Sequence, residues 1–218
     1  MKKFDYILFD FDGTIFNTSP GVFKSFDKVV EYYNLDIDKS LYNKMIGPPL
    51  YESFSNILHL PESEIRNAID VYRKEYSKGR MFDCTVYDGV IDLIQSLRNA
   101  GKKVCVATSK PEIYAREILK KNNLTELFDF IGGSDTEEKS RVNKIDVIKY
   151  VLESQHLTDK KDKVLMIGDR HYDVNGAHLA GLECMGILWG FGTREEFTEC
   201  KADYICSSTS EVKALLCS

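Results

Sequence analysis

The sequence predicts an α/β protein with a doubly wound, mostly parallel sheet, and two observations carry this prediction. Short continuous apolar runs end abruptly in polar or small residues, as is typical of strands that are covered on both faces. Segments with apolar residues at helical spacing alternate with these runs, as they do where crossover helices link parallel strands. Strands are expected at 6–9, 104–107, 128–131, 164–167 and 185–189, and helices at 90–97, 113–119, 145–152 and 174–179.

Several of the expected elements have a recognisable end. The first strand gives way to Asp10, the second to Thr108 and the fourth to Gly168. The weaker strand at 128–131 is expected to stop at Gly132-Gly133. The first helix of the α/β pattern is expected to end at Gly101, because glycine is common directly after helix C-termini.

A long interval interrupts this alternation between the first strand and Val86. It is far longer than a single crossover helix requires. Helical patterns occur in it around 22–33, 50–58 and 65–76, and prolines separate them. We therefore expect an inserted helical cap domain at 16–84, and an α/β core formed by 1–15 and 85–218.

Composition and charge exclude several classes of protein. The 218 residues include 34 acidic and 29 basic side chains, and the net charge of -5 argues against nucleic acid or an anionic membrane as the partner. No apolar run approaches the roughly 20 residues that span a bilayer, and the N-terminus lacks the pattern of a signal peptide. The six cysteines show no C-x-x-C pair, so reduced thiols are expected. The sequence predicts a cytoplasmic protein, either a monomer or a weak homodimer.

The clearest chemical signal is Phe9-Asp10-Phe11-Asp12-Gly13-Thr14, which stands directly at a predicted strand end. Such a stretch also occurs in Asx-turns and calcium loops, but Gly21 stands where a calcium loop would have glutamate. The other strand ends supply Thr108-Ser109-Lys110, Lys144 before a helix, and Gly168-Asp169 with Asp173 four residues on. Because ligands of doubly wound folds bind at the carboxyl ends of the strands, we expect these residues to form one site.

Aspartate, hydroxyl, lysine and aspartate in this order resemble the four motifs of the haloacid dehalogenase-like superfamily. The resemblance covers essentially the whole chain and implies a Rossmann-like core with a cap inserted after the first motif. It also implies hydrolysis of a small phosphate ester through an aspartyl-phosphate intermediate. Haloalkanoate dehalogenases of the same superfamily lack the second aspartate of the first motif, so Asp12 favours phosphoryl chemistry.

The resemblance implies a role for each matching residue. Asp10 would be the nucleophile, and Asp12 the general acid and base. Lys144 would offset the negative charge that gathers when a carboxylate approaches a phosphate, and Lys110 could share this task. The implied catalytic set is Asp10, Asp12, Thr108 and Lys144, and the implied phosphate-binding set is Phe11, Thr14, Ser109 and Lys110, partly through backbone amides.

Mg²⁺ is the implied cofactor, held by Asp10, Asp169 and the backbone carbonyl of Asp12. The role of Asp173 stays open between contact with a metal-bound water and anchoring of Lys144. His171 is expected to start a surface helix. Two departures from the family pattern occur: Asn17-Thr18 replaces an Asp-Ser or Asp-Thr pair, and no proline follows Lys144.

Three interpretations of function stay open. The first is a phosphatase acting on phosphoglycolate, a nucleoside monophosphate or a sugar phosphate, because residues 46–50, 168–173 and 190–192 resemble a branch of phosphoglycolate phosphatases and 5'-nucleotidases. The second is a phosphoryl transferase similar to β-phosphoglucomutase, or a pyrophosphatase. The third is a non-catalytic binding protein that retains the fold.

Overall fold

The computed structural model describes residues 4–136 and 140–217, which form two compact units. The α/β unit comprises Met1–Phe16 and Val86–Ser218, and the helical unit comprises Asn17–Thr85. Two short strands, β2 (Phe16–Asn17) and β3 (Thr85–Val86), pair with each other where the chain leaves the α/β unit and returns to it. The two segments that connect the units therefore form one two-stranded sheet.

The α/β unit is built on a six-stranded sheet with the order β5-β4-β1-β6-β7-β8. All five pairings between neighbouring strands are parallel, so the carboxyl ends of the strands share one edge. The strands are β1 (Tyr6–Phe9), β4 (Lys103–Pro111), β5 (Phe130–Ser134), β6 (Val164–Gly168), β7 (Glu183–Ile187) and β8 (Tyr204–Cys206).

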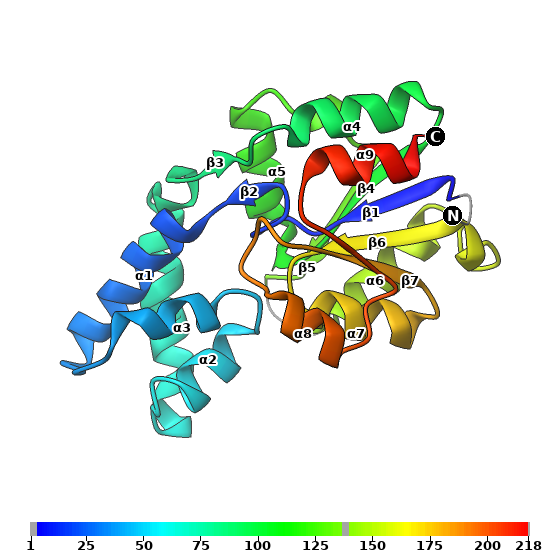
Figure 1. The fold of residues 1–218 in the computed structure, drawn as a ribbon. Coiled ribbons are helices and arrows are strands. Elements are labelled where there is room, and N and C mark those ends of the chain that lie inside the picture. Colours follow the sequence, from blue (N-terminus) through cyan, green and yellow to red (C-terminus); the bar gives the residue numbers. More distant parts are fainter. Residues whose placement is uncertain (1–3, 137–139, 218) are drawn as a thin grey trace. The chain divides into compact units, whose positions relative to one another are not determined.

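Helices cover both faces of this sheet, which confirms the predicted doubly wound α/β class (Figure 1). One layer holds α4 (Val90–Asn99), α5 (Glu112–Lys121) and α9 (Thr209–Leu216). The other layer holds α6 (Lys144–Ser154), α7 (His171–Ala180) and α8 (Arg194–Glu199). Short 3₁₀ turns, η3 (Thr125–Leu127) and η4 (Lys161–Lys163), precede β5 and β6.

The central strand β1 is buried on both faces, which accounts for its continuous apolar sequence. Ile7, Leu8 and Phe9 of β1 are each fully buried, since helices cover both of its faces. Leu8 joins a core cluster with Val147 of α6 and Val174 of α7. A continuous apolar run at 6–9 is the expected signature of such a strand.

Several strand boundaries differ from the prediction, most of all that of β4, which continues to Pro111. β5 runs through Gly132-Gly133 to Ser134 instead of stopping before them. The glycines are needed for packing here, since a Cβ at Gly133 would come within 2.6 Å of Glu112 Cα. β7 ends at Ile187 instead of Trp189. The structure also adds β8, α8 and α9, which were not predicted.

The outer edge of β5 is bonded by side chains where a further strand would otherwise pair. Arg116 Nη2 donates to Ile131 O at 2.7 Å, and Arg141 Nε donates to Gly133 O at 2.9 Å. Glu112 Oε2 accepts from Gly133 N at 3.3 Å. These three peptide groups of β5 therefore have side-chain partners within their own chain.

The helical unit consists of α1 (Ser19–Tyr32), α2 (Leu50–Asn56) and α3 (Glu62–Ser77), with 3₁₀ turns η1 (Lys39–Met45) and η2 (Arg80–Phe82). Its core is aromatic: the Phe26 ring contacts those of Tyr42, Phe54 and Tyr72, at centroid distances of 5.2 to 6.1 Å. Aromatic side chains bury a large area per residue, which lets a small helical unit form its own core.

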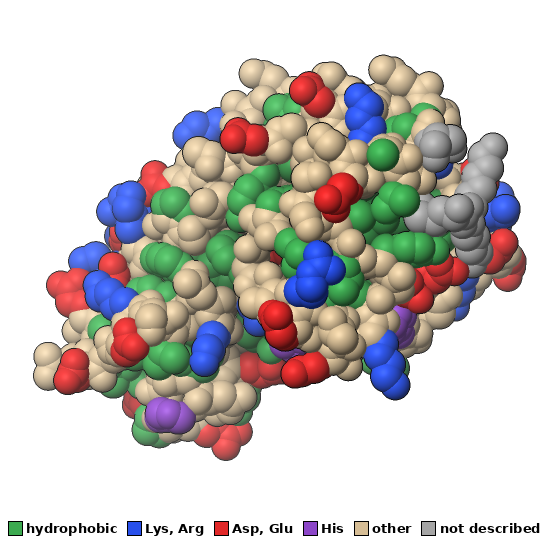
Figure 2. All heavy atoms as spheres, viewed as in Figure 1, with side chains coloured by type: hydrophobic (Ala, Val, Ile, Leu, Met, Phe, Trp, Pro, Cys, Tyr) green, Lys and Arg blue, Asp and Glu red, His purple; other side chains and the backbone are tan. Residues whose placement is uncertain are grey.

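One face of the molecule carries charges of both signs. On the face drawn in Figure 2, acidic and basic side chains are interspersed, and the coloured residues form no continuous basic area. Within residues 4–136 and 140–217, no helix combines the length and the apolar character that a membrane crossing needs.

Candidate active site

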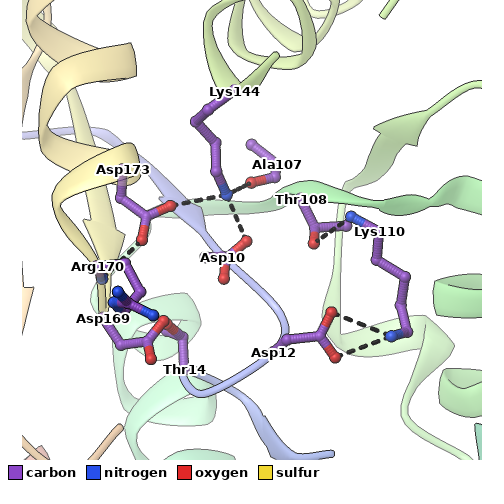
Figure 3. A network of polar contacts seen from close by, with 10 residues as sticks. All are labelled: Asp10, Asp12, Thr14, Ala107, Thr108, Lys110, Lys144, Asp169, Arg170 and Asp173. Atoms are coloured by element: carbon purple, nitrogen blue, oxygen red, sulfur yellow. Dashed lines mark hydrogen bonds and ion pairs between the residues drawn. The ribbon is translucent and has the colours of Figure 1, made fainter. Parts of the chain in front are cut away.

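The polar residues that follow the strands meet at the carboxyl edge of the sheet (Figure 3). Asp10 follows β1, Thr108 lies in β4, Lys144 is the first residue of α6, and Asp169 follows β6. Parallel pairing in register brings the ends of β1, β4 and β6 side by side. Segments separated by more than 150 residues in the chain thereby contribute to one cluster of side chains.

Lys144 is the cation at the centre of this cluster. Its Nζ is hydrogen-bonded to Asp10 Oδ1, lies 2.7 Å from Asp173 Oδ1 and donates to Ala107 O at 3.1 Å. Two of these oxygens accept hydrogen bonds from the ammonium, and Asp173 Oδ1 forms an ion pair with it. The stem passes close to Gly176 of α7, where a Cβ would come within 2.7 Å of Lys144 Cγ.

Asp173 has two tasks in the first turn of α7. One oxygen pairs with Lys144, and the other accepts from Arg170 N at 3.0 Å, which caps the helix. Gly168 leaves room for this side chain, since a Cβ there would lie 2.1 Å from Asp173 Cγ. Of the two roles left open for Asp173, anchoring of Lys144 is the one whose contact the structure contains.

Asp169 is held by neutral donors. Thr14 Oγ1 donates to Asp169 Oδ1 at 3.4 Å, and the backbone N–H of Phe191 donates to Oδ2 at 2.8 Å. Thr14, one of the predicted phosphate-binding residues, directs its hydroxyl to this carboxylate. Trp189 Nε1 in turn donates to Thr14 O at 3.1 Å, so the segment after β7 fixes both residues.

Gly13 allows the turn after β1 to pass directly beside Asp169. Its φ is +82°, a left-handed conformation that favours glycine. A Cβ at this position would lie 2.0 Å from Asp169 Oδ2. The Asp-x-Asp-Gly signal therefore has a steric reason in addition to its carboxylates.

Asp12 points away from the other acidic residues and toward Lys110 (Figure 3). Lys110 Nζ donates to both carboxylate oxygens, at 2.9 and 3.0 Å, and its side chain is 5% exposed. A register irregularity between Thr108 and Pro111 displaces this end of β4 from regular pairing. Thr108 Oγ1 accepts from Lys110 N at 3.1 Å and stabilises the irregular segment.

The phosphate-binding candidates thus occupy different environments. Phe11 is fully buried and its ring stacks on Phe16 at 4.8 Å, which leaves only its backbone for a ligand. Ser109 is partly exposed in β4, between Thr108 and Lys110.

Burial disfavours the ionised form of the carboxylates in this cluster unless further positive charge is nearby. Burial raises the pKa of Asp10 to about 7, although Lys144 opposes this shift. Burial, with Asp173 and Asp10 nearby, also raises the pKa of Asp169 well above its ordinary value. Burial alone would lower the pKa of Lys144, but Asp10 and Asp173 raise it above its ordinary value.

These carboxylates fit a divalent cation. Oxygen atoms of Asp10, Asp169 and Asp173, all buried, lie within 4.8 Å of one another. Carboxylate oxygens are the ligands that Mg²⁺ prefers, and the positive charges of Lys144 and the nearby Arg170 do not balance three carboxylates. The donor set and its uncompensated charge are both suited to Mg²⁺.

Sequence reasoning missed the residues that hold Asp169 and the turn after it. Phe191 contributes a backbone amide, a group that every residue except proline has, so nothing in its identity marks the contact. Glu196 of α8 accepts from Arg170 Nε and from the backbone N–H and Nδ1 of His171, at 2.7 to 3.0 Å. His171 starts α7 as expected, and Glu196 is an unexpected partner.

Known proteins share this fold and sequence over nearly the full chain. A 5'-nucleotidase from Pseudomonas aeruginosa is 30% identical over 215 residues, which cover 98% of this chain and 96% of that protein. The crystal structure of a predicted phosphatase from Clostridium acetobutylicum superposes with a TM-score of 0.92 at 38% identity and covers 98% of each chain. A tyrosine-protein kinase from Mycobacterium tuberculosis is 32% identical over 207 residues, 94% of this chain and 67% of that protein.

The family assignment agrees with the geometry of the site. Residues 7–187 match the haloacid dehalogenase-like hydrolase family, a range that includes Asp10, Thr108, Lys144 and Asp169. The phosphatases among the similar proteins and structures place the chain on the phosphatase side of this family. The chain belongs to the haloacid dehalogenase-like hydrolases and is a phosphatase-type member of that family.

Proposed function

We propose that this protein is a Mg²⁺-dependent phosphatase that hydrolyses small phosphate monoesters with Asp10 as nucleophile. One observation carries the proposal: Asp10 is bonded to the buried ammonium of Lys144 inside a cluster of three carboxylates. Asp12, two residues further on, is held separately by Lys110. The two aspartates of the first motif therefore have different environments, as different chemical tasks require.

In the first half of the reaction, a carboxylate oxygen of Asp10 attacks phosphorus and the bond to the leaving oxygen breaks. Asp12 gives its proton to that leaving oxygen, and an aspartyl phosphate is left on Asp10. In the second half, Asp12 takes a proton from a water molecule, which attacks phosphorus and releases inorganic phosphate. Asp10 is thereby returned to its carboxylate form.

The other residues orient these two aspartates and the phosphate. Lys144 holds Asp10 in place and balances its charge, while the hydroxyl of Thr108 and the backbone N–H groups near Phe11 and Ser109 can donate to phosphate oxygens. Thr14 orients Asp169.

Asp10, Asp169 and the backbone carbonyl of Asp12 would hold Mg²⁺, with Asp173 as the third carboxylate of the buried cluster. When bound, the ion supplies positive charge that offsets the repulsion between a carboxylate and a phosphate dianion.

The substrate class is proposed from the relatives. One relative is the 5'-nucleotidase described above. Another is a pyrophosphatase from Bacillus mycoides, which is 27% identical over 215 residues. Both names imply small phosphorylated substrates. We propose that the helical unit Asn17–Thr85 acts as the cap that selects among such substrates. Phosphoglycolate, nucleoside monophosphates and sugar phosphates are the compounds to test.

The test is phosphate release from a panel of these esters and pyrophosphate, with Mg²⁺ or with chelator. The variant is Asp10→Asn, and Asp159→Asn, an exposed residue, is the matched control. We expect metal-dependent release by the wild type and the control, and none by Asp10→Asn. Wild-type rates in Asp10→Asn would refute the proposed nucleophile. A phosphorylated Asp10 that water does not hydrolyse to inorganic phosphate would indicate a transferase.

A further inference from the structure

The segment that follows β7 wraps around Asp169 and the turn after it. Phe191 N bonds to Asp169 Oδ2, and Gly192 lies so close that a Cβ there would be 2.1 Å from Asp169 O. Thr193 caps α8 and accepts from Glu196 N at 3.2 Å. This segment lies beyond residues 7–187, the range that matches the family.

Glu196, in the helix at the end of this segment, holds the turn after Asp169 through three bonds. A single carboxylate oxygen, Oε1, accepts from Arg170 Nε at 3.0 Å, from His171 N at 2.7 Å and from His171 Nδ1 at 2.7 Å. The side chains of Glu196 and Arg170 are only 19% and 12% exposed. Hydrogen bonds to an ionised acceptor are stronger than those between neutral groups.

The two residues that Glu196 binds are two of the three that lie between Asp169 and Asp173 in the chain. Arg170 directly follows Asp169, and its backbone N–H donates to Asp173 Oδ2. His171 is the first residue of α7, the helix that carries Asp173. A constraint on this turn is therefore a constraint on the separation of Asp169 and Asp173.

We propose that Glu196 is a positioning residue that fixes the Arg170–His171 turn and thereby sets the geometry of the Asp10, Asp169 and Asp173 cluster for its divalent cation. The proposal rests on the proposed function, because that function assigns the cation. Groups outside the direct ligands of a metal commonly influence its affinity by holding the ligands in place. Glu196 acts in this way through the backbone of the turn.

A purely structural role for Glu196 would give a different result. In that case its loss would weaken the packing of α8 and lower the unfolding temperature, but the folded protein would bind the cation as before. The cation affinity of the folded protein therefore separates the two roles. It is measured without substrate, so it does not depend on turnover.

The experiment measures Mn²⁺ binding by electron paramagnetic resonance, and Mg²⁺ activation of phosphate release, for the wild type and three variants. Glu196→Gln keeps the size of the side chain and removes its charge. Glu196→Asp keeps the charge but shortens the side chain. Glu199→Gln, at an exposed position of the same helix, is the matched control for loss of charge.

We expect both Glu196 variants to bind Mn²⁺ about 10-fold more weakly than the wild type and to need correspondingly more Mg²⁺ for half-maximal activity. At saturating Mg²⁺ their kcat should return close to the wild-type value, and Glu199→Gln should match the wild type throughout. Thermal melting shows whether each variant is folded under the assay conditions.

Other outcomes would overturn the inference. Wild-type Mn²⁺ affinity in both folded Glu196 variants would leave Glu196 with a structural role only. Weak binding in Glu196→Gln but not in Glu196→Asp would indicate a long-range effect of charge. If the wild type itself bound no divalent cation, the cation site of the proposed function would fail, and this inference with it.

Discussion

Lys144 and Asp10 are joined by a buried ion pair although 134 positions separate them in the sequence. The side chains are only 6% and 9% exposed, so water does little to screen either charge. Asp173 lies on the other side of the ammonium at 2.7 Å. The lysine therefore bridges the end of β1 and the first turn of α7, and its loss would leave two buried carboxylates without their cation.

Replacement of Lys144 by methionine should affect stability as well as activity. Removal of one partner from a buried ion pair typically costs about 3–5 kcal/mol, so we expect a loss near the lower end of this range at pH 8 in chelator. Activity should fall below detection. Denaturant unfolding of Lys144→Met and of Lys149→Met, an exposed position on the same helix, checks this prediction. Equal stability of the two variants would contradict it.

Lys110→Met should reduce kcat more than stability. The variant releases both oxygens of Asp12 from the bonds that hold its carboxylate, so the proposed acid and base would sample unproductive orientations. Since acid–base catalysis contributes about 100-fold or more, a loss of about 10-fold in kcat is expected. Steady-state kinetics beside Lys120→Met, an exposed residue of α5, gives the comparison. An unchanged kcat would show that Asp12 does not depend on Lys110.

Two glycines with the same backbone conformation should respond differently to alanine. Gly13 and Gly101 have φ values of +82° and +80°, but a Cβ at Gly13 would strike Asp169, whereas nothing lies within 4 Å of one at Gly101. Both variants should lose about 1–2 kcal/mol of stability from backbone strain. Only Gly13→Ala should lose activity, by about 100-fold, because Asp169 is displaced.

Melting and kinetics of this matched pair separate strain from steric displacement. Similar activities in the two variants would mean that the site tolerates movement of Asp169.

Stability should fall in acid through Asp129, which joins β4 and β5. Burial favours a higher pKa, but Lys103, the Val104 amide and Arg98 outweigh it and hold the pKa of Asp129 below its ordinary value of 3.8. A carboxylate with a lowered pKa stabilises the fold at pH values above 3.8, and this contribution is lost as the pH falls below that value.

Asp129→Asn should therefore be less stable than the wild type at pH 7, by about 1–2 kcal/mol, and the difference should shrink as the pH falls below 3.8. Unfolding measured between pH 7 and pH 3 tests this prediction, with Asp159→Asn as the exposed control. A difference that stayed constant with pH would show that the charge of Asp129 is not responsible.

The elements that could be predicted are those whose burial requires a recognisable pattern of apolar residues. β1, β6 and residues 104–107 of β4 are covered by helices on both faces, so these runs contain almost only apolar residues. β8 has three residues and α8 has six, too few for a periodic pattern to stand out. α9 has only two buried residues, Val212 and Leu216, and its pattern is correspondingly weak.

The site could be predicted as far as its chemistry depends on residue type. Asp10, Lys144 and Asp169 are recognisable because carboxylates and an ammonium at strand ends have few structural explanations. The contact between Asp12 and Lys110 depends on the irregular end of β4, which no sequence pattern indicated. The contacts of Glu196 were not predicted for a similar reason, since a glutamate in a short helix is ordinarily a solvent-exposed residue and only the structure gives its partners.

The side chains along the outer edge of β5 also affect how copies of the protein behave toward one another. An exposed edge strand can recruit a strand from another molecule and so begin aggregation. Here a second chain could pair at Ile131 and Gly133 only by displacing Arg116, Arg141 and Glu112. Each displaced residue would leave a charged group to be resolvated beside the incoming strand. The edge is thus defended against sheet extension, which favours solubility of the folded protein at high concentration.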